Sequence, residues 1–555
     1  MKIATLISSV VLDCLWRTSA QADEALSGTA GTEATPTPLS AQAEPMQTGK
    51  FQPTWKSLEQ YQVPEWYRDA KFGIWAHWGP QCEAEDGDWY ARNMYSQGNR
   101  QYNSHLKAYG HPSVAGFKDV IHVWKAENWD PEKLVALYKD AGAKFVVALA
   151  NHHDNFDTYD SKYQPWNSVA MGPQKDLIGG WAKAARANGL PFGVTVHAAH
   201  AWSWYETSQG SDKTGEKAGV PYDGKLTKDQ GKGQWWEGLD PQDLYAQNHV
   251  PGKLIWEWNA KKGSSVPDAA YAEKFYNRTL DLINKYHPDI LYFDDTVLPL
   301  YPVSDVGLKI AAHFYNSNAL WHNGQNEGVL LGKVLSEEQK KCMVWDVERG
   351  ASPKIEPLPW QSETCIGNWH YDRGVYNGHH YKHADVVIRT MADVVSKNGT
   401  FLLNVPVRGD GTIDDQEVEI VKQVGAWMKV NGEAIYATRP WKVCGEGPAI
   451  EHAPAINAQG FNEGKIKLGV DDVRYTTKGN ILYAIVLGAP VKPVVLKSLG
   501  TTAALLDGSI QGIELVGSAD KVSWTQTPEA VTIQMPEHKP ANDEATVFKV
   551  LLKSR

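Results

Sequence analysis

The stretch Lys144-Phe-Val-Val-Ala-Leu-Ala150 decides the fold class, because it is a short apolar run that follows an amphipathic segment. That segment, 131–141, is expected to be a helix: Asp130 before it suits an N-cap, and Gly142 ends it. Apolar strands that alternate with such helices favour a parallel sheet with helices packed on it. The surroundings of this stretch therefore predict an α/β fold.

The same unit of helix and strand recurs between about residue 51 and residue 441. Eight such units would form a (β/α)8-type TIM barrel, and we predict that fold for 51–441. Two of the eight strands are weaker, and we place them at 319–322 and around 365–369. The six firm strands are 72–77, 144–150, 191–197, 290–294, 343–346 and 400–404, and further helices are expected at 176–189, 268–286 and 384–398.

Polar side chains gather where the predicted strands end. In a TIM barrel, the C-terminal ends of the strands and the loops that follow them form the active site. A purely structural role would not place ionisable residues at this one position repeatedly. The pattern therefore indicates an enzyme, with candidate residues His77, His152, His153, His197, Asp294, Asp346, Glu348 and Asn404.

Three further regions flank the predicted barrel. Residues 1–22 have a basic start, an apolar stretch and an Ala-x-Ala cleavage site, so they are expected to be a signal peptide that directs a secreted or periplasmic protein. Residues 23–50, rich in Ala, Thr, Pro, Gly and Glu, are expected to be a disordered linker. Residues 442–555 contain short Val, Ile, Leu and Thr runs separated by Gly, Pro and Asp, which predicts a C-terminal all-β sandwich.

Composition narrows the classes of partner. The net charge is -10 and no strongly basic block occurs, so nucleic acid is not an expected partner. No uncharged apolar run reaches 18 residues, so no membrane span is expected. The 23 tryptophans suit either a Trp-rich core or stacking on sugar rings. The cysteines outside the signal peptide lack zinc spacing, and we favour buried free thiols over disulfides for Cys82, Cys342, Cys365 and Cys444.

Two carboxylates stand at the ends of different predicted strands, Asp294 and Glu348. Retaining glycosidases hold a nucleophile and an acid/base about 5–5.5 Å apart across the scissile bond. The residues alone leave plainer roles open, since Asp294 could cap the end of its strand and Glu348 could pair with Arg349.

Four histidines at strand ends should face the same pocket. A neutral imidazole has one donor and one acceptor, which suits sugar hydroxyls. Clusters of His and Asp on a barrel also hold zinc, so a metal-dependent barrel hydrolase is the main rival. The adjacent pair His152 and His153 fits sugar binding better, because neighbouring side chains on extended backbone diverge.

Several motifs, in order along the chain, resemble those of the α-L-fucosidases of glycoside hydrolase family 29. The motifs are Trp66-Tyr-Arg-Asp-Ala-Lys-Phe-Gly-Ile-Trp-Ala-His-Trp-Gly79, Asp88-Trp-Tyr-Ala-Arg-Asn-Met-Tyr95, Asn151-His-His-Asp-Asn-Phe156, Tyr292-Phe-Asp-Asp295, Pro359-Trp-Gln-Ser-Glu-Thr-Cys365, Asn368-Trp-His-Tyr371, Leu402-Leu-Asn-Val-Pro406 and Asp410-Gly-Thr-Ile413.

The resemblance implies roles for the site residues. Asp294 aligns with the family nucleophile, and Glu348 is our choice for the acid/base, in a loop that also offers Asp346 and Glu356. No cofactor and no metal are implied. Residues expected to hold the sugar are His77, Asp88, Trp89, His152, His153, His197 and Trp369.

This chain departs from the family pattern at several positions. Asp88 stands where Glu is usual, Asn151 replaces a usual Lys, and His197 stands where Tyr and Ser are more common. Asp295 replaces Gly and puts a second carboxylate beside the nucleophile. If Asp295 pointed inward, coupling of like charges would raise one of the two pKa values.

The expected function is therefore an exo-acting retaining α-L-fucosidase whose partners are fucosylated oligosaccharides or glycoconjugates. The alternatives are a metal-dependent hydrolase, an α-L-galactosidase and an inactive fucose-binding homologue. Linkage preference and oligomeric state stay open. The insertion 206–248 is expected to lie over the barrel mouth, with Trp235 and Trp236 offered to the leaving sugar.

Overall fold

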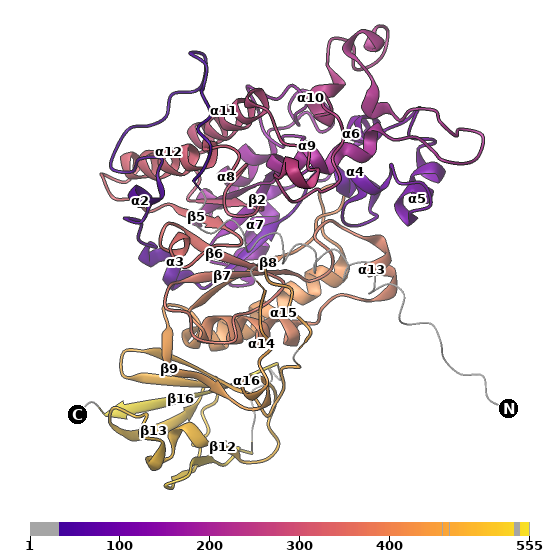
Figure 1. The fold of residues 1–555 in the computed structure, drawn as a ribbon. Helices are drawn as coiled ribbons and strands as arrows, with labels where there is room; N and C mark the ends of the chain where they lie inside the picture. Colours follow the sequence, from indigo (N-terminus) through magenta and orange to yellow (C-terminus); the bar gives the residue numbers. More distant parts are fainter. Residues whose placement is uncertain (1–32, 458, 466, 538–543, 554–555) are drawn as a thin grey trace, which may run out of the picture.

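The computed structural model describes residues 33–457, 459–465, 467–537 and 544–553. Its larger part is a closed barrel of eight parallel strands in the order β1 to β8, surrounded by helices (Figure 1). The predicted TIM barrel is therefore confirmed. The barrel strands are β1 Phe72–Ala76, β2 Val146–Asn151, β3 Phe192–Val196, β4 Ile290–Phe293, β5 Val329–Gly332, β6 Val344–Glu348, β7 Trp360–Cys365 and β8 Gly399–Asn404.

The six firm strand predictions are confirmed, and the two weaker ones are corrected. Residues 319–322 are not a strand, because their apolar side chains belong to the last turn of α12 (Val306–Trp321). The fifth strand is β5, which follows eight residues later in the chain and is buried along its whole length. The other weak strand is β7, which ends at Cys365 where the predicted segment was placed to begin.

Side chains that cap helix N-termini explain where the barrel helices start. Asp130 accepts a hydrogen bond from the backbone N–H of Lys133, and Asp176 and Asp268 cap their helices in the same way. The barrel helices are α7 Pro131–Asp140, α8 Leu177–Ala187, α11 Ala269–Tyr286, α12 Val306–Trp321, α14 Ala384–Ser396 and α15 Asp415–Asn431. The shorter helices are α2 Trp55–Leu58, α3 Glu65–Ala70, α4 Tyr90–Asn93, α5 Arg100–Ala108, α6 Phe117–Val123, α9 Ala201–Trp204, α10 Pro241–Tyr245, α13 Arg373–Gly378 and α16 Pro448–Glu451.

The C-terminal part consists mainly of β-strands, as predicted, and also contains the one-turn helix α16. A five-stranded antiparallel sheet has the order β13-β16-β11-β10-β9, and a three-stranded sheet has the order β12-β15-β14. Buried apolar side chains of both sheets, including Tyr475 and Val531, form a second core. The strands are β9 Arg439–Glu446, β10 Val473–Lys478, β11 Ile481–Val486, β12 Val494–Leu496, β13 Ser509–Leu515, β14 Trp524–Gln526, β15 Val531–Ile533 and β16 Thr546–Lys553.

The segment before the barrel differs from the expected linker. Residues 33–50 are not a disordered segment, because side chains of the outer helices accept hydrogen bonds from several of their backbone N–H groups. Asn277 of α11 accepts from the N–H of Glu44 at 2.8 Å, and His313 of α12 accepts from that of Gln47 at 2.9 Å. Residues 23–32 and the predicted signal peptide, 1–22, lie outside the described residues, so export stays a prediction.

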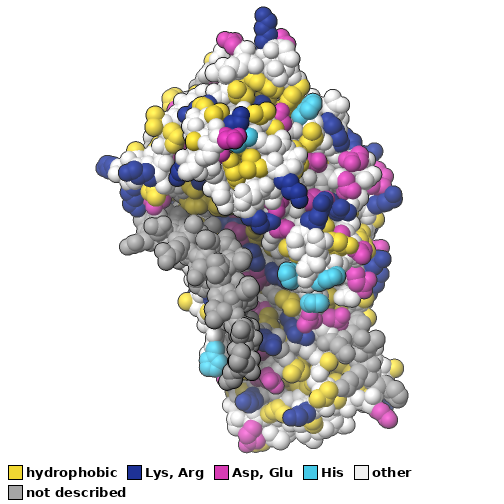
Figure 2. Space-filling view, turned by 90° about the vertical axis from the view of Figure 1, so that its right-hand side faces the viewer, with side chains coloured by type: hydrophobic (Ala, Val, Ile, Leu, Met, Phe, Trp, Pro, Cys, Tyr) yellow, Lys and Arg dark blue, Asp and Glu magenta, His cyan; other side chains and the backbone are white. Residues whose placement is uncertain are grey.

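The four cysteines Cys82, Cys342, Cys365 and Cys444 are buried free thiols. Figure 2 shows basic and acidic side chains interspersed over the visible face, without a basic stripe. Within the described ranges, no helix combines the length and the apolar character that a membrane crossing requires.

A buried ion cluster joins the two domains. Arg474 of β10 donates to Asp393 of α14 at 2.5 Å, and Lys397 donates to the other carboxylate oxygen at 2.7 Å. Burial alone would raise the pKa of Asp393, but the charges of Lys397 and Arg474 outweigh burial and hold it below its ordinary value. In Figure 1 the five-stranded C-terminal sheet lies next to α14, and the three-stranded sheet with β12 lies farther from the barrel.

We predict that Arg474→Met lowers the free energy of unfolding by about 3–5 kcal/mol. The variant leaves the buried Asp393 carboxylate with only one of its two cationic partners, Lys397. Urea unfolding and calorimetry measure the change. The control is Lys442→Met, which removes an exposed ion pair with Asp507 and should cost less than about 1 kcal/mol. Equal losses in both variants would contradict a special role for the buried cluster.

Candidate active site

Nearly all the sequence-predicted site residues lie at one end of the barrel. His77 follows β1, His152 and His153 lie in the turn after β2, and His197 follows β3. Asp294 follows β4, and Glu348 is the last residue of β6. Parallel strands all present their C-terminal ends at the same face, so residues far apart in sequence converge here.

Asp294 has a cationic and a neutral partner. Its Oδ1 is 2.5 Å from Nζ of Lys333, and its Oδ2 is 2.9 Å from Nδ1 of His197. Burial would raise the pKa of Asp294, but the charge of Lys333 and the contacts of His197 and His153 outweigh burial and hold it well below its ordinary value. Asp294 is therefore an ionised carboxylate, which is the form that a nucleophile requires.

His197 supplies one of these contacts as a neutral ring. Burial lowers its pKa, so at neutral pH the ring carries one proton. That proton must lie on Nδ1, because the carboxylate of Asp294 only accepts hydrogen bonds. Asn151, the other departure in this region, accepts from the backbone N–H groups of His197 and Ala198 and so fixes the loop after β3.

Lys333, directly after β5, joins three carboxylates. Its Nζ is 2.5 Å from Asp294, 2.7 Å from Glu348 and 3.0 Å from Glu363 of β7. Carboxylate oxygens of these three residues lie within 4.8 Å of one another. Burial would lower the pKa of Lys333, but the carboxylates around it raise it well above its ordinary value, so it remains an ammonium.

Two more deeply buried carboxyls, those of Asp346 and Glu363, have raised pKa values, in contrast to Asp294. The hydroxyl of Tyr292 lies 2.7 Å from Glu363 and 3.1 Å from Asp346, and Gln361 donates to Asp346 at 2.7 Å. Burial raises the pKa of Asp346 to about 7 and that of Glu363 well above its ordinary value. The single hydroxyl proton of Tyr292 is not the only donor to this pair, because Lys333 also lies 3.0 Å from Glu363.

The three acid/base candidates occupy different places. Glu348 is close to Asp294 and partly open to solvent, with a side chain 14% exposed. Asp346 is fully buried beneath it. Glu356 precedes β7 and so lies at the opposite end of the barrel, where it accepts from Ser352 and lines a surface depression with Trp345 and Trp360.

Asp295 does not point toward Asp294. Its Oδ1 lies 2.7 Å from Nε2 of His200, and both side chains are almost fully buried. The ring of Trp258 stacks on His200 with centroids 4.4 Å apart. Asp295 therefore has its own partner, and the inward orientation that would couple it to Asp294 is not found.

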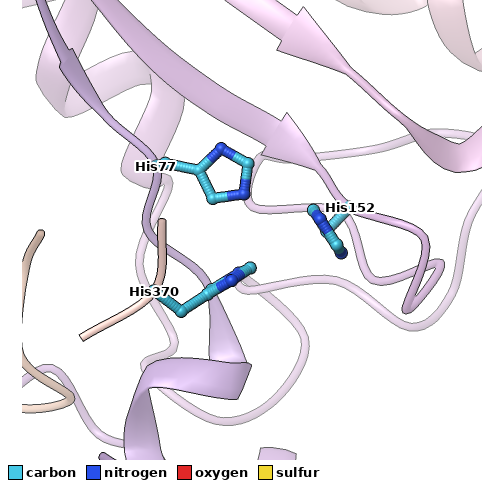
Figure 3. Close-up of side chains that lie close together, drawn as sticks. All are labelled: His77, His152 and His370. Carbon is cyan, nitrogen blue, oxygen red and sulfur yellow. The ribbon is translucent and has the colours of Figure 1, made fainter. Parts of the chain in front are cut away.

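The histidines form a compact group beside Asp294. Figure 3 shows His77, His152 and His370 turned toward one another, with centroids between 4.6 and 5.1 Å apart. Burial lowers the pKa of His77 and of His152 well below the ordinary value, so both rings are neutral at neutral pH. Neutral imidazoles suit either sugar hydroxyls or a metal ion, and ligand atoms of these three residues lie within 4.8 Å of one another.

Aromatic side chains close the pocket. Trp89, held at φ 63°, has its ring 5.7 Å from that of Trp256, and Trp256 also lies 5.3 Å from His153. Trp369 lies 5.9 Å from His77. Such rings suit the apolar face of a sugar.

Trp235 and Trp236 are not part of this wall, which corrects the expectation for the insertion. Trp235 stacks on His122 of α6 with centroids 4.2 Å apart and donates to Asp119 at 2.9 Å. Trp236 is buried against Gly231 and the same helix. Both residues fix the insertion to the barrel, so they are structural.

Four residues of the site were missed from the sequence: Lys333, Glu363, His370 and Trp256. Lys333 was missed because β5 was placed one segment too early, although Val329-Leu-Leu-Gly-Lys333 is itself an apolar run with an ionisable end. Glu363 was quoted within a motif but given no role, because its position inside the barrel depends on the true extent of β7.

A parallel barrel with a close pair of carboxylates and a histidine-rich pocket at its C-terminal end is the arrangement of a glycoside hydrolase. The sequence model described as "Alpha-L-fucosidase" matches residues 39–433, and that of the "Alpha-L-fucosidase C-terminal domain" matches 469–552. The chain therefore belongs to the α-L-fucosidase family.

Individual relatives agree with this assignment. The tissue α-L-fucosidase of Rattus norvegicus is 25% identical over 515 residues, which cover 90% of this chain and 92% of the relative. The α-L-fucosidase of Branchiostoma floridae is 26% identical over 507 residues, covering 88% and 94%. Among solved structures, the α-L-fucosynthase of Thermotoga maritima has a TM-score of 0.65 at 24% identity and covers 91% of this chain and 100% of its own, which supports the fold.

We predict that Lys333→Met lowers kcat/KM by about 100- to 1,000-fold, since it removes a preorganised charge from the reacting groups. Loss of this charge raises the pKa of Asp294, so the acidic limb of the pH profile should move to higher pH. Steady-state kinetics across pH measure both effects.

The matched control is Lys333→Arg, which keeps the charge and should retain most of the original pH profile. A rate loss in Lys333→Met without any shift of the acidic limb would contradict the electrostatic role. Thermal melting of both variants separates a rate effect from unfolding.

Proposed function

We propose that the chain is an exo-acting retaining α-L-fucosidase in which Asp294 is the nucleophile and Glu348 the acid/base. The observation that carries the proposal is the close approach of these two carboxylates, whose oxygens lie within 4.8 Å of each other at the barrel mouth. This separation agrees with the roughly 5–5.5 Å of retaining glycosidases and is too short for an attacking water between them.

The two residues differ in a way that suits the two roles. Asp294 is ionised because Lys333 and His197 both contact it, so it can attack the anomeric carbon and form a glycosyl-enzyme. Glu348 is the more open of the candidates beside Lys333, so it can protonate the leaving oxygen and later activate water. A mechanism-based inhibitor is present in one structure of the Thermotoga maritima α-fucosidase, which supports a covalent step by analogy.

The histidine and tryptophan side chains define the sugar-binding part of the proposal. His77, His152 and His153 offer neutral ring nitrogens to the hydroxyls of the terminal fucosyl residue, while Trp89 and Trp369 cover its faces. The substrates are accordingly fucosylated oligosaccharides or glycoconjugates.

A metal-dependent hydrolase is the second candidate, and the grouping of His77, His152 and His370 is the observation that favours it. The carboxylate pair argues for the glycosidase, because Asp294 and Glu348 both contact the ammonium of Lys333, which compensates part of their charge without a metal. Activity that survives dialysis against a chelator and is not raised by added Zn²⁺ supports the glycosidase.

We predict that Asp294→Ala loses nearly all turnover on an aryl α-L-fucoside, because no group remains to attack the anomeric carbon. Added azide should restore turnover of the variant and yield a β-fucosyl azide, which NMR identifies. Asp295→Ala is the control: it breaks the contact with His200 and should lower stability while retaining much more activity. If Asp295→Ala were the variant that azide rescues, the assignment of the nucleophile would be wrong.

We predict that Glu348→Ala impairs fucosides with poor leaving groups by a further 100-fold or more relative to activated aryl fucosides, because only the former need a proton. The basic limb of the pH profile should also flatten. Glu356→Ala, at the other end of the barrel, is the control and should leave this ratio unchanged. Equal losses on both substrates in Glu348→Ala would move the role to Asp346.

A further inference from the structure

The carboxylate of Asp88 is turned toward the backbone of the loop after β7. Its Oδ1 accepts from the N–H of His370 at 2.7 Å, and its Oδ2 accepts from the N–H of Trp369 at 3.3 Å. Asn404, at the end of β8, donates to the carbonyl of Trp369 at 2.9 Å and so fixes the same loop from the other side. Both oxygens of Asp88 therefore have partners that determine where residues 369 and 370 lie.

The side chain that this contact positions is the imidazole of His370. It is 1% exposed and lies nearly perpendicular to the rings of His77 and His152, with centroids 4.6 and 4.8 Å away (Figure 3). His152 has a protein partner on one side, because its Nδ1 is 2.9 Å from Nε2 of Gln81. The ring of His370 thus belongs to the same group as two residues that the proposed function assigns to the sugar.

Neither ring nitrogen of His370 or of His77 makes a hydrogen bond within the described part of the chain. The nearest acidic atom to His370 is Oδ1 of Asp88, 3.5 Å from Nδ1, which is too long for a good hydrogen bond. Buried polar atoms without partners are rare, and they cost free energy unless a ligand supplies the missing contacts. The unpartnered nitrogens of two facing imidazoles therefore point to a ligand with several hydroxyl groups.

We propose that His370 binds a hydroxyl of the terminal sugar and determines specificity, and that Asp88 is the positioning residue that holds it there. This inference rests on the proposed function and deepens it. The inference changes the role expected for Asp88, which was to bind the sugar directly. The Asp88 carboxylate instead holds the backbone of the loop, and the imidazole of His370 contacts the sugar hydroxyl. Because an imidazole both donates and accepts, a hydroxyl satisfies it where a deoxy position does not.

The decisive experiment combines residue variants with substrates that each lack one hydroxyl. His370→Ala should lower kcat/KM for an aryl α-L-fucoside by about 10- to 100-fold, as expected for loss of a hydrogen bond to substrate. The 2-, 3- and 4-deoxy fucosides are then compared in both proteins. For the deoxy sugar that lacks the contacted hydroxyl, His370→Ala should cause less than about 3-fold further loss.

Two further variants keep the test independent of folding. His370→Asn is smaller but still donates and accepts, so it should retain activity between that of the wild type and that of His370→Ala. His313→Ala removes a buried histidine of the outer helix α12 that bonds to Gln47 and Asn284. It should lower the melting temperature and leave the ratios among the deoxy substrates unchanged.

The role of Asp88 is tested by combining it with His370. Asp88→Asn should lower kcat/KM in the wild type, because its amide group cannot accept both backbone N–H groups. In the His370→Ala background the same change should add less than about 3-fold, because only the longer contact of Asp88 with the N–H of Trp369 is then left to act on the sugar. Losses that multiply would mean that Asp88 touches the sugar itself and would overturn this change of role.

The result also distinguishes this inference from the proposed function. If the wild type hydrolyses the fucoside and His370→Ala loses equally on all the deoxy substrates, the inference fails and the proposed function stands. If the wild type neither hydrolyses fucosides nor binds L-fucose in a calorimetric titration, both fail. If the wild type binds L-fucose without turnover, weaker binding by His370→Ala supports the inference while the proposed catalysis fails.

Discussion

The contact between the buried ammonium of Lys333 and the carboxylates around it is the interaction on which the rest of the site depends. An unpaired charge in this place would be very unfavourable, so the ammonium requires Asp294 and Glu348 as much as they require it. The three residues follow or end β5, β4 and β6, which are neighbours in the barrel, so parallel pairing of these strands brings their C-terminal ends together. The strand order of the barrel therefore sets up the charge compensation of the site.

One ammonium cannot neutralise four carboxylates, so the four carboxyl groups differ in protonation. The more deeply buried ones have raised pKa values. Asp346 and Glu363, which share the hydroxyl of Tyr292, have raised pKa values because of burial, and so they take up protons. Asp294 keeps its charge because Lys333 and His197 both contact it. Protonation of the deep pair thus leaves the charge of Lys333 mainly to the two carboxylates at the mouth, to which the proposed function assigns catalysis, although Glu363 also contacts the ammonium.

Much of this site follows from the sequence, because parallel strands bring their C-terminal ends to one face. The positions of His77, His197 and Asp294 follow from that rule and from correct strand ends alone. Lys333 could not be placed while the apolar end of α12 was taken for a strand. The orientation of Trp235 depends on its contacts with α6, and a pattern in sequence carries no information about such contacts. The order in residues 33–50 likewise comes from side chains of helices more than 200 residues away in the chain.

Two of the departures from the family pattern, at His197 and Asp88, have a similar effect on the charge of the site. His197 brings a neutral imidazole into contact with Asp294, while Asp88 turns its charge toward backbone N–H groups. Each change keeps a hydrogen-bonding group in place and keeps net negative charge away from Asp294. Because Asp294, the proposed nucleophile, has to stay ionised beside three other carboxyls, a further anion near it would oppose the field of Lys333. Neutral hydrogen-bonding groups around the proposed sugar site do not weaken the field of Lys333 at Asp294 and Glu348. The site can therefore bind sugar hydroxyls and keep the proposed nucleophile ionised at the same time.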